Sequence, residues 1–312
     1  MPLYLALGMA LCGCEMAPAP PKFSMVQESW SFGPIEGHKI VTDHFDIHST
    51  LVDAELEAAL PSFLESAHRE YRRLLPQQEG KPRLQTYVFN NRAQWEAFTR
   101  MRFPESFQVY RRITAGGYAH GNLCVVYYIQ RPYTLSVLAH EGMHQYFGNN
   151  FDVTLPAWLN EGLATYAESF ELAGGQPVFT PRHNTFRLNA LREALTTDSI
   201  LPLKEMLATD AGKVLIQGQS RLVQTYYAQV WAMTVFLRHG AGGRYASGFD
   251  RILAEIVSGE LPRTAQAARI SAPSPSKTSY GEAIFRAHIT TDLETFEQEF
   301  KAYMIELAGF SK

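Results

Sequence analysis

The segment Leu138-Ala-His-Glu-Gly-Met-His-Gln-Tyr-Phe147 carries the pattern HExxH among apolar residues suited to a half-buried helix. Residues four apart on an α-helix project from one face, so the imidazoles of His140 and His144 can converge on one metal ion. Glu141 is rotated by about 100° around the helix axis and can face a water molecule beside that ion. The pattern therefore predicts a zinc site, provided that a third ligand lies near it.

The third ligand is sought downstream of the two histidines. In the extended form of the motif a glycine and a further ligand follow, but Phe147 and Asn150 occupy those positions. The segment Pro156-Ala-Trp-Leu-Asn-Glu-Gly-Leu-Ala-Thr-Tyr-Ala-Glu168 predicts a second helix, with proline in its first turn and apolar residues at helical spacing. Glu161 on this helix is the predicted third ligand. Two imidazoles and one carboxylate leave a fourth position open, as in catalytic zinc sites.

The sequence HEGMH followed by PAWLNEGLATYAE resembles the gluzincin metallopeptidases, and more closely the small peptidase-MA-like proteins of the DUF1570 type. The resemblance covers residues 116–237 with specific motifs. It implies an α+β fold with a small N-terminal half of strands and helices, a mainly helical C-terminal half, and a zinc cleft between them. It also implies one Zn²⁺ ion as cofactor, held by His140, His144 and Glu161.

The activity that these residues predict is zinc-dependent hydrolysis of peptide bonds, with Glu141 as the general base for a metal-activated water. The resemblance further implies a tyrosine on a later helix that donates a hydrogen bond to the tetrahedral intermediate. Tyr227 is favoured for this role, and the adjacent Tyr226 remains an alternative. The Gly-Met-Glu-Asn type of signature seen in aminopeptidases is absent before the zinc helix. This absence favours an endopeptidase or a processing peptidase, although exopeptidase action stays open.

The stretch at residues 115–129 begins with glycines and ends in a β-branched and aromatic run that predicts a strand. The resemblance implies that a strand of this kind borders the cleft and pairs with an extended substrate backbone. Gly117, His120 and Asn122 are therefore candidate substrate-binding residues. His120 can equally be a loop histidine without a role in binding.

Two other functions remain open for the same residues. A catalytically silent, zinc-stabilised binding or assembly module would keep the ligands for structure alone. A hydrolase of a non-peptide bond would use the same water activation on another substrate. The presence of Glu141, which could act as a general base, favours a hydrolase over the catalytically silent module.

Composition limits the partners that the chain can have. Of the 312 residues 46% are hydrophobic, which excludes a disordered chain, and the net charge is −3. No basic cluster is present, so nucleic-acid binding is not expected. The expected partner is a peptide or protein substrate, and no specific protein partner can be identified.

Residues 1–21 predict an export signal followed by a proline-rich tether. Leu11-Cys-Gly-Cys14 resembles the lipobox of bacterial lipoproteins, which implies a lipidated Cys14. The chain is then exported in a bacterium, either anchored to a membrane or periplasmic. The alternative is an ordinary buried N-terminal strand or helix. Cys124 stands alone in an apolar segment, so no intrachain disulfide is expected.

The remaining chain is expected to form two subdomains. Residues 22–133 predict an α+β subdomain that ends in the cleft edge strand, with a helix from near Asp53, a strand at Leu84–Phe89 and a helix at Arg92–Arg102. Residues 134–312 predict a helical subdomain that binds zinc, with a surface loop at residues 271–279. Its expected helices are 134–147, 156–171, 187–196, 222–238, 244–258 and 293–307.

Overall fold

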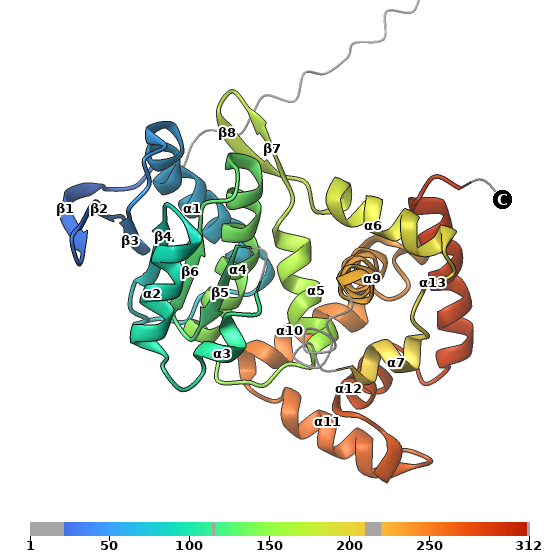
Figure 1. Cartoon of the computed structure of the whole chain (residues 1–312). Coiled ribbons are helices and arrows are strands. Elements are labelled where there is room, and N and C mark those ends of the chain that lie inside the picture. The colour runs from blue at the N-terminus through green and yellow to red at the C-terminus, as the bar shows by residue number, and fades with distance from the viewer. Residues whose placement is uncertain (1–21, 114–115, 210–219, 311–312) are drawn as a thin grey trace, which may run out of the picture.

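The computed structural model describes residues 22–113, 116–209 and 220–310. These form a mixed α+β fold with one six-stranded sheet, one small hairpin and a majority of helices. Figure 1 shows the sheet on one side and the C-terminal helices on the other, with α4 (Arg131–Asn150) and α5 (Ala157–Ala167) between them. The prediction of an α+β fold with its strands in the N-terminal part is confirmed.

The sheet has the strand order β1-β2-β3-β4-β6-β5. Strands β3, β4 and β6 are parallel to one another, whereas β1, β2 and β5 run antiparallel to their neighbours. The strands are β1 (Val26–Phe32), β2 (Ile35–Val41), β3 (Phe45–Ser49), β4 (Leu84–Phe89), β5 (Gly117–His120) and β6 (Leu123–Tyr127).

The apolar run that the sequence places at the cleft edge is instead an internal strand. It forms β6, which pairs with β4 on one side and β5 on the other. Gly121, with a φ of 57°, takes the left-handed conformation that lets the chain reverse between β5 and β6. At this end of the sheet the terminal strand is therefore β5, and the predicted edge position moves to residues 117–120.

Helices cover both faces of this sheet. On one face α1 (Ala54–Leu74) and α4 pack into the main core, and on the other α2 (Arg92–Arg102) and α3 (Phe107–Tyr110) cover a smaller aromatic cluster. The carboxylate of Asp53 caps α1 by accepting a hydrogen bond from the Leu56 amide. Trp95 of α2 is fully buried and donates its indole N–H to the Val125 carbonyl at 3.1 Å.

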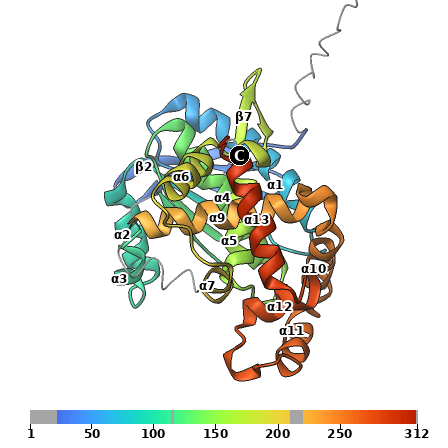
Figure 2. The same ribbon diagram turned by 90° about the vertical axis from the view of Figure 1, so that its right-hand side faces the viewer.

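The C-terminal half is built around α9 (Ser220–His239), which packs against α5, α6, α10 and α13. Figure 2 shows α13 in front of α9 in the turned view, with α10, α11 and α12 gathered beside it. The other helices are α6 (Thr185–Thr196), α7 (Leu203–Ala208), α10 (Ala246–Ser258), α11 (Leu261–Ile270), α12 (Tyr280–His288) and α13 (Leu293–Leu307), with short 3-10 turns η1 (Pro181–His183), η2 (Ala241–Gly243) and η3 (Pro275–Lys277).

The predicted helix at 156–171 is too long. It ends at Ala167, and the next residues form a hairpin of β7 (Phe170–Ala173) and β8 (Gln176–Phe179). Gly174 and Gly175 connect the two strands with φ values of 58° and 78°. Two consecutive residues with positive φ suit the tight turns of two-residue hairpins, and glycine adopts them without strain. The glycine pair therefore favours a hairpin in the segment that follows the helix.

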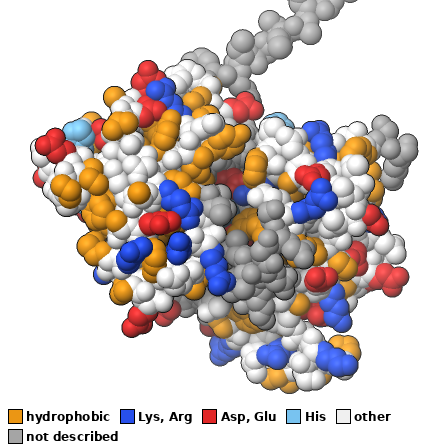
Figure 3. Space-filling model, in the orientation of Figure 1, with side chains coloured by type: hydrophobic (Ala, Val, Ile, Leu, Met, Phe, Trp, Pro, Cys, Tyr) orange, Lys and Arg blue, Asp and Glu red, His pale blue; other side chains and the backbone are white. Residues whose placement is uncertain are grey.

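The proposed boundary at residues 133 and 134 does not separate two cores. One cluster of buried side chains extends from Ile40 in β2 to Met304 in α13 and includes residues of α1, α4, α5 and α9. Residues 1–21, with the predicted leader and Cys14, lie outside the described residues. Among the described helices, none has the length and hydropathy needed to cross a membrane. On the face shown in Figure 3, acidic, basic and hydrophobic side chains are intermingled.

Candidate metal centre

Helix α4 carries His140, Glu141 and His144, and close packing fixes its position. The Tyr71 hydroxyl of α1 donates a hydrogen bond to the Ala139 carbonyl at 2.7 Å. A Cβ atom at Gly142 would lie only 2.6 Å from that hydroxyl oxygen, so α1 and α4 approach closely because this residue is glycine. The two histidines are thus held on a helix that is anchored one residue before the first ligand.

Helix α5 brings Glu161 against the same face of α4. Its own packing against α9 is tight, since a Cβ atom at Gly162 would lie 2.4 Å from Thr234 Oγ1. At its start, the buried Trp158 donates its indole N–H to the Gly281 carbonyl of α12 at 3.3 Å. Helix α5 is therefore wedged between α4 and α9, and residues from all three helices meet at one place.

The three predicted ligands converge through single atoms. His140 Nε2 lies 3.3 Å from His144 Nε2 and 3.3 Å from Glu161 Oε2, and His144 Nε2 lies 3.4 Å from Glu161 Oε2. A zinc ion that binds donors at about 2.0–2.1 Å with tetrahedral angles separates them by about 3.3–3.4 Å. The triangle of donor atoms thus has the size of one face of a tetrahedral zinc site.

The state of Glu161 supports this fit. Its side chain is buried, yet Oε2 accepts no hydrogen bond of acceptable geometry from any described residue. A buried carboxylate oxygen without a donor is costly unless a cation satisfies it. Two imidazole nitrogens and this oxygen form the donor set of His₂Glu catalytic zinc sites, so the residues present fit a zinc ion.

A second group of residues orients His140. Its Nδ1 lies 2.8 Å from Glu168 Oε2, at the end of α5. Glu168 also accepts hydrogen bonds from Arg187 Nε at 2.6 Å, from Arg187 Nη2 at 2.9 Å and from Asn184 Nδ2 at 2.7 Å. A carboxylate on the far nitrogen of a ligating histidine fixes its tautomer and raises its basicity. Glu168 therefore prepares His140 to present Nε2 to a metal.

His144 has a weaker partner of the same kind. Its Nδ1 lies 3.2 Å from Asn160 Oδ1, in the residue just before Glu161. The amide oxygen accepts a hydrogen bond from the Nδ1–H group and leaves Nε2 free to ligate. Both histidines are thus oriented by side chains of α5.

The electrostatics of the cluster favour a cation. Burial lowers the pKa of His140, but Glu161 and Glu168 outweigh it and raise the pKa to about 10. Glu161 and Glu168 are also buried, which raises their pKa, but the neighbouring cations prevail: His144 and His140 hold the pKa of Glu161 well below its usual range, and Arg187 and His140 lower that of Glu168 to about 2. Without metal the site therefore retains protons that a divalent cation can replace.

A cavity of 460 Å³ opens at the ligands, and Glu141 and Tyr227 line it together with them. Burial, above all, raises the pKa of Glu141, which suits a group that accepts and returns a proton near neutral pH. The Tyr227 ring lies 5.9 Å from the His140 ring, and burial raises the pKa of its phenol well above the ordinary value. Tyr227 is therefore a neutral hydrogen-bond donor beside the ligands.

The structure separates the other predicted residues. Tyr226 is fully buried and is not among the residues that line the cavity, so the two adjacent tyrosines differ in access to the ligands. Gly117 of β5 does line the cavity. His120 and Asn122 do not. His120 lies 3.2 Å from the Tyr110 hydroxyl, and the Asn122 carbonyl accepts hydrogen bonds from Gln85 and Gln145.

Four residues of the site were not predicted: Asn160, Glu168, Asn184 and Arg187. Glu168 has a sequence signal, because it follows Glu161 by seven residues and two helical turns return it to the same face. Asn160 directly precedes a ligand. Asn184 and Arg187 belong to a different segment, and their role depends on how α6 packs beside α5 and α9.

Comparison with known proteins gives one match. The model of a family described as "Protein of unknown function (DUF1570)" matches residues 134–250. The matched segment contains His140, Glu141, His144, Glu161 and Tyr227. The chain is thus similar to this family over the segment that carries the site. No curated protein and no solved structure matches the chain.

Proposed function

We propose that the protein is a zinc-dependent hydrolase of the gluzincin type that cleaves peptide bonds. The observation that carries this proposal is the 3.3–3.4 Å triangle of His140 Nε2, His144 Nε2 and Glu161 Oε2, with Glu141 and Tyr227 on the wall of the same cavity. A zinc ion bound there supplies a Lewis acid and lowers the pKa of a water to near 7.

The residues around the ligands have separate roles in the proposed reaction. Glu141 does not belong to the donor triangle, so it is free to take the proton of the attacking water and pass it to the leaving amine. Tyr227 keeps its proton and donates a hydrogen bond to the oxyanion that develops. Glu168 and Asn160 hold the two imidazoles in the required tautomer.

The substrate that best suits this cavity is an extended peptide. Strand β5 ends the sheet, and its residues Gly117, Tyr118 and Ala119 line the cavity. A terminal strand can pair with an extended backbone through main-chain hydrogen bonds. We therefore favour an endopeptidase or processing peptidase. The sequence of residues 1–21 supports the further proposal that it works outside the bacterial cytoplasm, anchored through Cys14.

The substitution Glu141→Gln tests this function. It removes the base and leaves all three donor atoms in place, so we expect normal zinc content and a loss of peptide cleavage of about 10²–10⁴-fold or more. The measurement is zinc content and turnover of a mixed peptide library by the wild type and the variant. Glu171→Gln, at an exposed position in β7, is the matched control and should retain activity.

Other outcomes distinguish the alternatives. Equal cleavage by the wild type and Glu141→Gln contradicts the proposed mechanism. Zinc binding without cleavage of any peptide supports the silent module. A third outcome supports a different substrate class: the wild type cleaves no peptide but hydrolyses an ester or another non-peptide bond, and Glu141→Gln loses that activity.

A further inference from the structure

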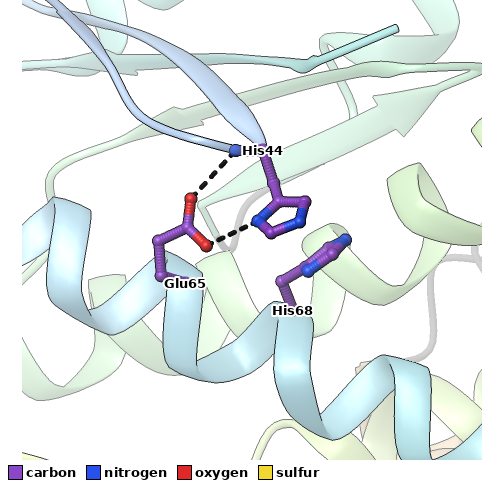
Figure 4. A group of neighbouring side chains, drawn as sticks. All are labelled: His44, Glu65 and His68. Atoms are coloured by element: carbon purple, nitrogen blue, oxygen red, sulfur yellow. Dashed lines mark hydrogen bonds and ion pairs between the residues drawn. The ribbon is translucent and has the colours of Figure 1, made fainter. Parts of the chain in front are cut away.

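A second cluster of metal-ligating side chains lies where the chain enters β3. His44 precedes that strand, and Glu65 and His68 lie three residues apart on α1. Residues at this spacing share a helix face. Figure 4 shows the Glu65 carboxylate and the two imidazole rings grouped between the strand and the helix. One donor atom from each of the three residues lies within 4.8 Å of the others.

The contacts of His68 leave its nitrogens available. The residue is 2% exposed, and no hydrogen bond joins its ring to another residue in the described part of the chain. Its neighbours are rings: His44 is stacked on it at 4.0 Å, and Tyr146 meets it edge-on at 5.4 Å. The His68 ring nitrogens are not among the fully buried polar atoms that lack a partner, so a small ligand can reach them without displacing a protein hydrogen bond.

A small cavity adjoins both histidines. It has a volume of 40 Å³, which is enough for one or two water-sized particles, and His44 and His68 are among the residues that line it. Asp43 also lines the cavity, and together with the buried Glu65 it offsets the charge of the nearby Lys81 and Arg83.

We propose that His44, Glu65 and His68 bind a second transition-metal ion, for which zinc has the best-suited chemistry. Two imidazoles and one carboxylate suit zinc, and a Glu-x-x-His pair on one helix is a known way to project a carboxylate and an imidazole together. Donor atoms on a tetrahedral zinc ion lie about 3.3–3.4 Å apart, and His44 Nδ1 lies closer than this to Glu65 Oε2, so a small movement is required. His44 can provide it, because its side chain is 31% exposed.

The movement has a defined starting point. His44 Nδ1 now lies 2.7 Å from Glu65 Oε2, and the His44 amide donates to Glu65 Oε1 at 3.0 Å. Rotation of the His44 ring exchanges the first contact for the metal and keeps the second. Burial lowers the pKa of His68 to about 3, so this ligand is already neutral at neutral pH.

A metal at this place joins three elements. It links the start of β3 to α1, and through the His68–Tyr146 ring contact it braces α4 two residues beyond His144. The site is separate from the catalytic ligands and does not depend on the proposed activity. Its role is to stabilise the packing of α1 and α4, on which the position of the first metal depends.

The test is the zinc content of four folded proteins after equilibrium dialysis at pH 7.5. We expect two ions for the wild type, one for His44→Gln, one for Glu161→Ala, and none for the double variant. The His44→Gln variant retains a side-chain donor for Glu65. Because the side chain at position 44 is partly exposed, we expect this variant to fold. Circular dichroism of each variant checks that the fold is intact.

Two further variants sharpen this result. His68→Ala should also lose the second ion, and Glu55→Gln, which changes an exposed carboxylate of the same helix α1 away from the cavity, should keep it. A single ion in the wild type that is lost with Glu161→Ala overturns the second site and leaves the proposed function intact. A second ion that persists in His44→Gln, or disappears in Glu55→Gln, overturns the assigned ligands.

Discussion

Tyr226 and Tyr227 are adjacent on α9, but Tyr227 lines the cavity and Tyr226 is fully buried outside it. We expect Tyr227→Phe to lower kcat by about 10²–10³-fold, the usual effect of removing one donor to an oxyanion, with little change in zinc content. Tyr226→Phe serves as the matched control and should keep turnover close to that of the wild type. Steady-state kinetics on one peptide substrate compares the two variants.

The reverse result would assign the role to Tyr226. If both variants retain full turnover, neither phenol stabilises the transition state, and the oxyanion is stabilised by another group.

Glu168 joins His140 to Arg187, and both charged partners are buried. Glu168→Gln keeps a hydrogen-bonding side chain but leaves the Arg187 charge without its carboxylate. We expect zinc affinity to fall by about 10–100-fold and the free energy of unfolding to fall by about 3–5 kcal/mol. Chelator competition and denaturant titration measure the two effects. An unchanged zinc affinity would show that Glu168 does not orient His140.

At the scale of residues, sequence spacing predicted the three side chains that the structure brings to one point, but not the groups that hold them. HExxH places two imidazoles on one face by helix geometry alone, and Glu161 follows from a second helix with a recognisable start. The residues that bond to Glu168 come from the segment at Asn184 and Arg187, which no local pattern connects to α5. Their role depends on tertiary packing.

At the scale of elements, the contact of α5 with α9 determines whether Glu161 and Tyr227 meet at the site. Gly162→Ala would place a Cβ atom 2.4 Å from Thr234 Oγ1 and push the two helices apart. Alanine is intrinsically better in a helix than glycine by about 1 kcal/mol, but overpacking costs about 1–3 kcal/mol. We expect lower stability, measured by denaturant titration, and lower turnover.

A compensating substitution isolates the cause. Thr234→Ala removes the atom that the new Cβ would meet, so Gly162→Ala with Thr234→Ala should recover much of the lost stability and turnover. If the double variant is as impaired as Gly162→Ala, a clash with Thr234 is not the reason for the defect.

The elements that sequence predicted well are those with a long helical period and an apolar face. Helix α4 was placed to within three residues at each end, since the helix expected at 134–147 is Arg131–Asn150 in the structure, and Pro132 in its first turn is a start signal that was missed. The hairpins β1–β2 and β7–β8 and the helices α7, α11 and α12 were not predicted. These are short or largely exposed, so periodicity is weak and tertiary contacts decide their structure.

At the scale of the whole molecule, the proposed zinc binding is coupled to stability and to pH. His140 has a pKa of about 10 in the folded, metal-free protein, and zinc requires the neutral ring, so each bound ion releases at least one proton below that pH. Zinc affinity should therefore rise with pH. One released proton corresponds to about 1.4 kcal/mol per pH unit, or about 2.7 kcal/mol between pH 6 and pH 8.

In the metal-free protein, the contribution of His140 to stability changes with pH in the opposite direction. A raised pKa of His140 stabilises the folded state fully below the unfolded value of about 6.5 and loses that effect as the pH rises toward 10. The measurement is the free energy of unfolding at pH 6 and pH 8, with and without zinc, for the wild type and Glu161→Ala. If zinc raises the free energy of unfolding of the wild type by the same amount at pH 6 and at pH 8, binding does not displace a proton.

The α+β class and the order of strands before helices could be predicted, because composition and periodicity change along the chain. Whether the two predicted subdomains share one core could not be judged from the sequence, because this depends on how helices far apart in the chain pack together. In the structure the buried cluster joins both parts, and α4 and α5 lie within it. The ligands therefore rest on elements that both halves support.

An anomalous-scattering map from crystals grown with zinc would show directly whether the three side chains bind the ion. We expect a peak at about 2.0–2.1 Å from His140 Nε2, His144 Nε2 and Glu161 Oε2, with Glu141 beside it and not bound to it. A well-ordered site without a peak at these three atoms, in crystals that contain zinc, would contradict the proposed zinc site.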